Sequence, residues 1–123
     1  MSHFTKVRTQ LQDLGMVKRA LIDLGYSVSQ GQVQGYGGQT VTAPVVVKLS
    51  SGMEIGFQKD GKFVQLVADF WGQTVDREQF VAQVTQRYAY LTVIDQAEKQ
   101  GWQIMTDEAQ NDGSVRLVMQ RWS

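Results

Sequence analysis

The stretch APVVVKLSSGMEIGFQKDGKFVQLVADF, residues 43–70, decides the fold class of this chain. It contains three apolar runs rich in β-branched and aromatic residues, the composition typical of strands. The runs span residues 43–49, 53–58 and 62–70. The pairs Ser51-Gly52 and Asp60-Gly61 separate them, and glycine accepts the positive φ of a tight hairpin turn without steric cost. We therefore expect three consecutive antiparallel strands.

Before this stretch, the pattern changes from a strand to a helix and back to a strand. Residues 2–9 alternate apolar and polar side chains, the period-2 pattern of a half-buried strand. A helical stripe follows, formed by Leu14, Val17, Leu21 and Leu24. The stripe stops at Gly25, a residue favoured just after a helix. The spacing predicts a helix over about residues 11–24 and a strand over 26–33.

After residue 70, the sequence predicts a second helix and a last hairpin. Asp76 can cap the helix, and Gln79 can complete a capping box. The helix should end before Gly101, and the hairpin should pair residues 102–108 with 114–122.

The predicted element order is β-α-β-β-β-β-α-β-β within one domain, residues 1–123. Because hairpin connections dominate, we expect an α+β fold, with one antiparallel sheet of about six or seven strands and both helices on one face. Each half of the chain resembles a strand, a helix and an antiparallel pair, which suggests an internal pseudo-repeat. The alternative is that glycine followed by an aromatic residue is common wherever a helix leads into a strand.

Composition excludes several kinds of chemistry. The chain has no cysteine, and His3 is its only histidine, so thiolate nucleophiles, cysteine metal sites and two-histidine metal sites cannot form. Twelve basic residues balance twelve acidic ones, which argues against a nucleic-acid partner. No signal peptide or membrane span is evident, and we expect no metal and no cofactor.

The segment GQVQGYGGQT, residues 31–40, is rich in glycine but lacks the dinucleotide fingerprint. Thr40 stands where the third glycine belongs, and no helix follows to present backbone amides to a phosphate. We expect a loop between two strands. Tyr36 could nevertheless fold over a ligand or a partner, so the candidate binding loop comprises Gly35, Tyr36, Gly37, Gly38 and Gln39.

The second helix carries more apolar surface than one core face needs. One stripe suffices for the core and is formed by Phe80, Val84, Tyr88, Leu91 and Ile94. A second set of mostly small side chains could pack closely against another copy or a partner helix. This candidate interface comprises Ala82, Ala89, Tyr90, Val93 and Ala97. The alternative is that alanine is simply a good helix former on a neutral surface.

Two other functions stay open from the residues alone. Glu54 and Asp69 lie on adjacent predicted strands and, with Arg87, could serve a small enzyme as an acid–base site. A weak single-stranded RNA binder could instead stack bases on the aromatic rings of Tyr36, Tyr90 and Trp122.

Several segments together resemble a known family. They are RALIDLGY (19–26), GYGGQT (35–40), VTQRYAYLTV (84–93) and DGSVRLVMQRW (112–122). The chain resembles, end to end, the hypothetical chloroplast open reading frame 35 family of uncharacterised cyanobacterial and plastid proteins. The resemblance implies a location in the cyanobacterial cytoplasm or the plastid stroma, and it transfers no activity or catalytic residue. Our leading hypothesis is a non-enzymatic binding or assembly module that recognises a protein, with a small ligand as a further possibility.

Overall fold

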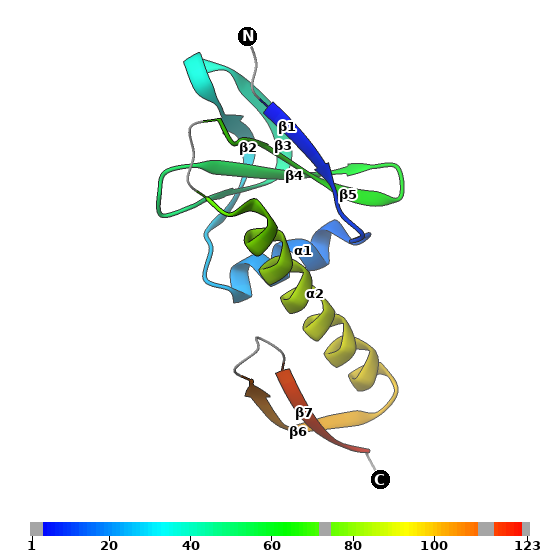
Figure 1. Ribbon diagram of the computed structural model, residues 1–123. Coiled ribbons are helices and arrows are strands. Elements are labelled where there is room, and N and C mark those ends of the chain that lie inside the picture. The colour runs from blue at the N-terminus through cyan, green and yellow to red at the C-terminus, as the bar shows by residue number, and fades with distance from the viewer. Residues whose placement is uncertain (1–3, 72–74, 111–114, 122–123) are drawn as a thin grey trace.

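The structure, a computed structural model, describes residues 4–71, 75–110 and 115–121 (Figure 1). The elements follow the predicted order: β1 (Phe4–Arg8), α1 (Leu14–Asp23), β2 (Val28–Gln34), β3 (Thr40–Lys48), β4 (Glu54–Asp60), β5 (Phe63–Asp69), α2 (Arg77–Lys99), β6 (Trp102–Ala109) and β7 (Val115–Arg121). The α+β class and the antiparallel pairing of the strands are confirmed.

The strands divide between two sheets rather than forming the single sheet that we expected. Five of them form an antiparallel sheet in the order β1-β5-β4-β3-β2, and β6 pairs only with β7. The length of α2 explains the division, because its 23 residues extend roughly 35 Å at 1.5 Å per residue. Figure 1 shows α2 leaving the five-stranded sheet and carrying the last hairpin to its far end. Both helices lead into an antiparallel pair, but only the first pair joins the large sheet.

Both helices cover one face of the five-stranded sheet, as expected. Val17 and Leu21 of α1 and Phe80 and Val84 of α2 are buried in one cluster with the strands. The ring centroids of Phe57 and Phe80 lie 6.3 Å apart across this helix–sheet contact. The opposite face of the sheet carries a smaller cluster, formed by Val33, Ala43 and Val46 with Phe4 packed against it.

The helix ends follow capping chemistry. The Asp76 side chain accepts a hydrogen bond from the Gln79 amide at 3.0 Å, so the predicted cap of α2 is confirmed. The first helix begins later than predicted, because Asp13 caps it by accepting from the Met16 amide. Leu24, which we expected in the core, is 36% exposed, since the helix has already ended there.

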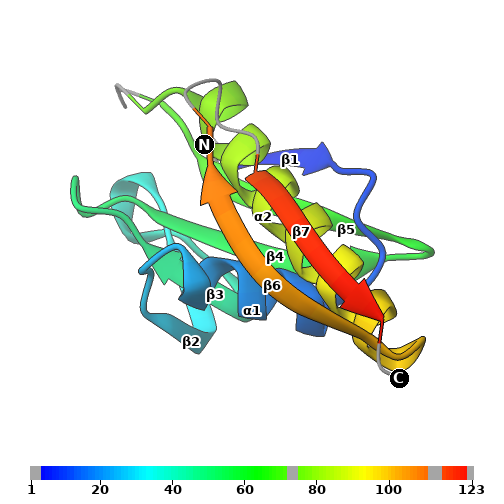
Figure 2. The same ribbon diagram turned by 90° about the horizontal axis from the view of Figure 1, so that it is seen from below.

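The β6–β7 hairpin packs against the C-terminal part of α2. Figures 1 and 2 place it on the side of the helices that faces away from the large sheet. Val93, Ala97, Trp102 and Met119 line a cavity of about 340 Å³ between helix and hairpin. Neither helix in the described part of the chain combines the length and apolar character that a membrane crossing requires.

Candidate functional site

A large groove, with a volume of about 1020 Å³, lies between β1 and α2. The β1 wall is residues 5–8, and the α2 wall includes Val81, Ala82, Thr85 and Ala89. Alanine and threonine side chains are short, so this face of the helix leaves room beside the strand. The short side chains of α2 therefore form one wall of the groove.

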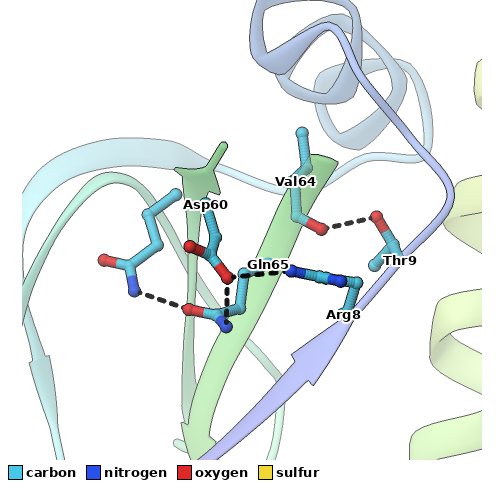
Figure 3. Close-up of polar contacts among 6 residues, drawn as sticks. Arg8, Thr9, Asp60, Val64 and Gln65 are labelled. Carbon is cyan, nitrogen blue, oxygen red and sulfur yellow. Dashed lines mark hydrogen bonds and ion pairs between the residues drawn. The ribbon is translucent and has the colours of Figure 1, made fainter. Parts of the chain in front are cut away.

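The other wall is an open sheet edge. The Thr9 amide donates to the Val64 carbonyl at 3.0 Å, and the Thr9 hydroxyl donates to the same oxygen at 2.7 Å (Figure 3). Backbone groups of successive strand residues point to alternate sides, so those of Lys6 and Arg8 point away from β5. Within the described residues, no other strand pairs with β1 on that side. The edge therefore offers two backbone amides and two carbonyls beside the groove.

Basic side chains predominate around the groove. Lys6, Arg8 and Arg77 line it together with a single acid, Glu78. The Arg8 guanidinium lies 3.4 Å from the Asp60 carboxylate, and both side chains are more than half exposed (Figure 3). An ion pair this exposed contributes little to stability and can exchange partners. The site is therefore apolar inside and positively charged along its rim.

The predicted small-residue interface on α2 is divided between two places. Ala82 and Ala89 line the groove beside β1. Val93 and Ala97 instead line the cavity under the hairpin, and Ala97 is only 8% exposed. Tyr90 lies beneath the Arg87 guanidinium, which is 4.6 Å from the centre of its ring. The structure thus divides the set between two separate cavities.

The loop between β2 and β3 is shorter than predicted: residues 31–34 continue β2, Thr40 begins β3, and the residues between them close around a short 3₁₀ turn at Tyr36–Gly38. The Gly35 amide donates to the Gln39 carbonyl at 2.7 Å, and Gly37 has a φ of 70°. A Cβ added at Gly35 would lie 2.7 Å from the Phe4 ring. Close packing at one glycine and a left-handed conformation at another explain this composition. The chain then continues into β3 at Thr40, so no α-helix follows the glycines to present amides to a phosphate.

A buried carboxylate fixes this loop beside a second aromatic residue. Asp69 is 6% exposed and accepts from the Tyr36 amide at 2.8 Å and the Trp71 amide at 3.0 Å. The two rings meet edge to face, and each residue is 57% exposed. They border a cavity of about 480 Å³, which Glu54 also lines. The loop therefore presents an ordered aromatic pair at the surface.

The acid–base site suggested by the sequence is not assembled. Glu54 and Asp69 do line one cavity. Glu54, however, accepts a hydrogen bond from the Gln34 amide at 2.8 Å, and Asp69 accepts from the amides of Tyr36 and Trp71. Arg87 lies between the two helices, where its Nε is 3.0 Å from Asp23. Both carboxylates accept hydrogen bonds from backbone amides, and the arginine joins α1 to α2.

In the RNA-binding alternative, the two described aromatic residues have different neighbours. Tyr36 packs against Trp71, whereas Tyr90 packs against Arg87 on α2. Trp122 and His3 lie outside the described residues.

Among the residues that the structure describes, no group of three or more His, Cys, Asp or Glu side chains could hold a metal ion.

Sequence reasoning missed two parts of these sites. The edge position of β1 left no local signal, because it depends on which strand β1 pairs with. Trp71 could have been noticed, because it is a large aromatic residue two positions after the end of β5. The contact of Trp71 with Tyr36 on the glycine loop could not have been identified from their spacing in the sequence.

Comparison with known proteins agrees with the resemblance seen in the sequence. Residues 20–118 match the model of a protein family of unknown function, DUF1257. The chain is 35% identical to the uncharacterized protein ycf35 of Pyropia yezoensis over 100% of this chain and 99% of the relative. It is 37% identical to that of Guillardia theta over 99% and 98% of the two chains, and 34% identical to that of Cyanophora paradoxa over the same shares. No solved structure matches. The chain therefore belongs to the ycf35 family of proteins of unknown function.

Proposed function

We propose that this protein is a non-enzymatic binding module that holds an extended segment of a partner protein between β1 and α2. The bound segment would join the five-stranded sheet as a further strand. The observation that carries the proposal is the open edge of β1 directly beside an apolar groove of about 1020 Å³. The cyanobacterial cytoplasm or the plastid stroma is the compartment that we propose for it.

Strand addition uses two kinds of contact, and this groove supplies both. Main-chain hydrogen bonds at a sheet edge provide affinity, and pockets for alternate side chains provide specificity. The outward backbone groups of Lys6 and Arg8 provide the first, and the space over Ala82 and Ala89 provides the second. The helix also shields one face of the added strand from water, which strengthens its hydrogen bonds.

The edge strand β2, at the other side of the large sheet, is less suited to this role. Its pairing with β3 shifts register between Ser29 and Gly31. A bulge of this kind twists an edge away from further pairing, which is a recognised way of protecting it. The pairing of β1 with β5 keeps one register from Phe4 to Arg8. The sheet therefore has one regular edge, and that edge borders the groove.

Peptide selection followed by matched variants tests the proposal. Peptides would first be selected from a random displayed library on the wild-type protein. Fluorescence polarisation would then measure their affinities for the wild type, Ala89→Arg and Val93→Arg. Both variants place arginine at an exposed position of α2, but Ala89 lines the groove, whereas Val93 lines the separate cavity under the hairpin. We expect Ala89→Arg to weaken binding at least tenfold and Val93→Arg to leave it unchanged.

Amide hydrogen exchange identifies the binding edge independently. The bound peptide should protect the amides of Lys6 and Arg8, because their N–H groups face the groove. Equal binding to both arginine variants, or protection confined to other strands, would contradict the proposal.

A small-ligand site at the aromatic pair is a second candidate. Two exposed rings beside a cavity of about 480 Å³ favour it. A fragment screen by NMR, repeated on Trp71→Ala, tests this candidate: hits lost with the ring would support it, and the absence of hits would remove it.

A further inference from the structure

We infer that the segment held in the groove is acidic, with carboxylates at alternate positions and apolar residues between them, and that it belongs to a different protein rather than to a second copy of this chain. This inference rests on the function proposed above. It follows from the way in which β1 distributes its side chains between its two faces.

The two faces of β1 differ in chemistry. Val7 packs against the large core on the face that the helices cover. Phe4 packs against the small cluster on the opposite face, so alternation places Lys6 and Arg8 on that face too. Both basic residues are exposed. A strand added beside β1 would therefore meet an apolar surface on one face and two cations on the other.

The side chains of the added strand must alternate in the same way. Those on the helix side would lie over Val7, Val81 and Ala82, where apolar groups of modest size are favoured. Those on the other side would lie beside Lys6 and Arg8. Oppositely charged side chains on one face of neighbouring strands attract each other, so this position selects aspartate or glutamate. The recognition pattern is one acid at every second residue.

The helix wall adds no further selection by charge, because Arg77 and Glu78 both line it. The Asp60 carboxylate pairs with Arg8 at the strand end, but their 3.4 Å contact is largely exposed. A carboxylate of the partner could replace Asp60 or share the guanidinium with it, because such pairs are weakly held.

The same charges disfavour a second copy at this edge. If β1 paired with β1 of another copy, lysine and arginine would lie on one face with their own counterparts. Like charges on neighbouring strands destabilise pairing, and charged residues on edge strands are a common means of preventing self-association. The charges on β1 therefore disfavour pairing with β1 of a second copy and favour pairing with an acidic strand.

Three matched peptides test the inference. Each would have nine residues, with valine and threonine at alternate positions and glutamate, glutamine or lysine at the others. Binding would be measured by fluorescence polarisation at low and high salt. We expect the glutamate peptide to bind at least tenfold more tightly than the glutamine peptide and the lysine peptide to bind worst. The advantage of glutamate should shrink at high salt, because exposed charges are screened.

Charge variants locate the effect. Lys6→Gln/Arg8→Gln should remove the preference for glutamate, and Lys6→Glu/Arg8→Glu should transfer it to the lysine peptide. Lys18→Glu/Arg19→Glu is the matched control, since it reverses the same two residue types at exposed positions of α1. Circular dichroism would establish that every variant is folded.

The possible failures can be distinguished. If the glutamate and glutamine peptides bind equally and Ala89→Arg weakens both, the acidic preference is wrong while the groove remains the binding site. If library selection yields no peptide sensitive to Ala89→Arg, the proposed function itself fails. If light scattering shows a dimer of the wild-type protein that Ala89→Arg disrupts, a second copy occupies the groove and the inference of a different partner is overturned.

Discussion

Tyr36 and Trp71 come from distant parts of the sequence, yet their rings meet edge to face with centroids 4.7 Å apart. One buried carboxylate, that of Asp69, accepts a hydrogen bond from the backbone amide of each. The aromatic pair is thus held through its backbones, which leaves much of both rings exposed to solvent.

Asp69→Ala should destabilise the protein because it leaves two amides without their acceptor. We expect a loss of about 1–3 kcal/mol in the free energy of unfolding, the usual cost of an unsatisfied buried donor. Chemical denaturation would measure it, and the near-ultraviolet circular dichroism of the aromatic pair should weaken. The control is Asp60→Ala, whose carboxylate is largely exposed. A smaller loss for Asp69→Ala than for Asp60→Ala would contradict this role.

Leu21→Ala should cost roughly 2–5 kcal/mol, the range for truncating a buried leucine. Leu21 has no exposed surface and lies in the core beneath the large sheet. Its neighbour Ile22 is 54% exposed, so Ile22→Ala should change stability by less than about 0.5 kcal/mol. Denaturant titration of both variants checks the orientation of α1, and similar losses for the two would place the helix differently.

Millimolar ATP, NAD or FMN should leave the melting temperature unchanged. The glycine loop continues into β3 and so lacks the helix N-terminus that holds a phosphate. Ligands that bind only the native state raise its apparent stability, so thermal melting with and without each compound is a direct measurement. A concentration-dependent rise that Gly37→Val abolishes would show that the loop binds a nucleotide.

Ala97→Glu should loosen the β6–β7 hairpin while the five-stranded sheet stays intact. Ala97 is buried beside Trp102, and a buried charge without a partner is costly. A two-stranded hairpin has little stability of its own and depends on this contact. Amide exchange should accelerate in β6 and β7 but not in β3 to β5.

Ala89→Glu provides the comparison, because it places the same charge on an exposed position of the same helix. Unchanged exchange in the hairpin of Ala97→Glu would show that the hairpin does not depend on α2 for its order.

The sequence by itself determined the local structure of this protein. Alternation and β-branched residues predicted the strands of residues 43–70, and the hairpin turns at Gly52 and Gly61 followed from the conformations open to glycine. The cap at Asp76 and a loop within the glycine-rich segment were predictable for the same reason, although residues 31–34 joined β2. All of these depend on residues that are close together in the chain, where backbone sterics and neighbouring hydrogen bonds decide the outcome.

Only the tertiary structure decided which strands pair, and therefore where the candidate sites lie. The pairing of Phe4 with Asp69 makes β1 an edge strand beside α2, and no spacing in the sequence encodes it. The division into two sheets and the contact of Arg87 with Asp23 were likewise beyond local patterns. Such contacts join distant segments, and they form because the whole chain buries its apolar surface and satisfies its backbone groups at once.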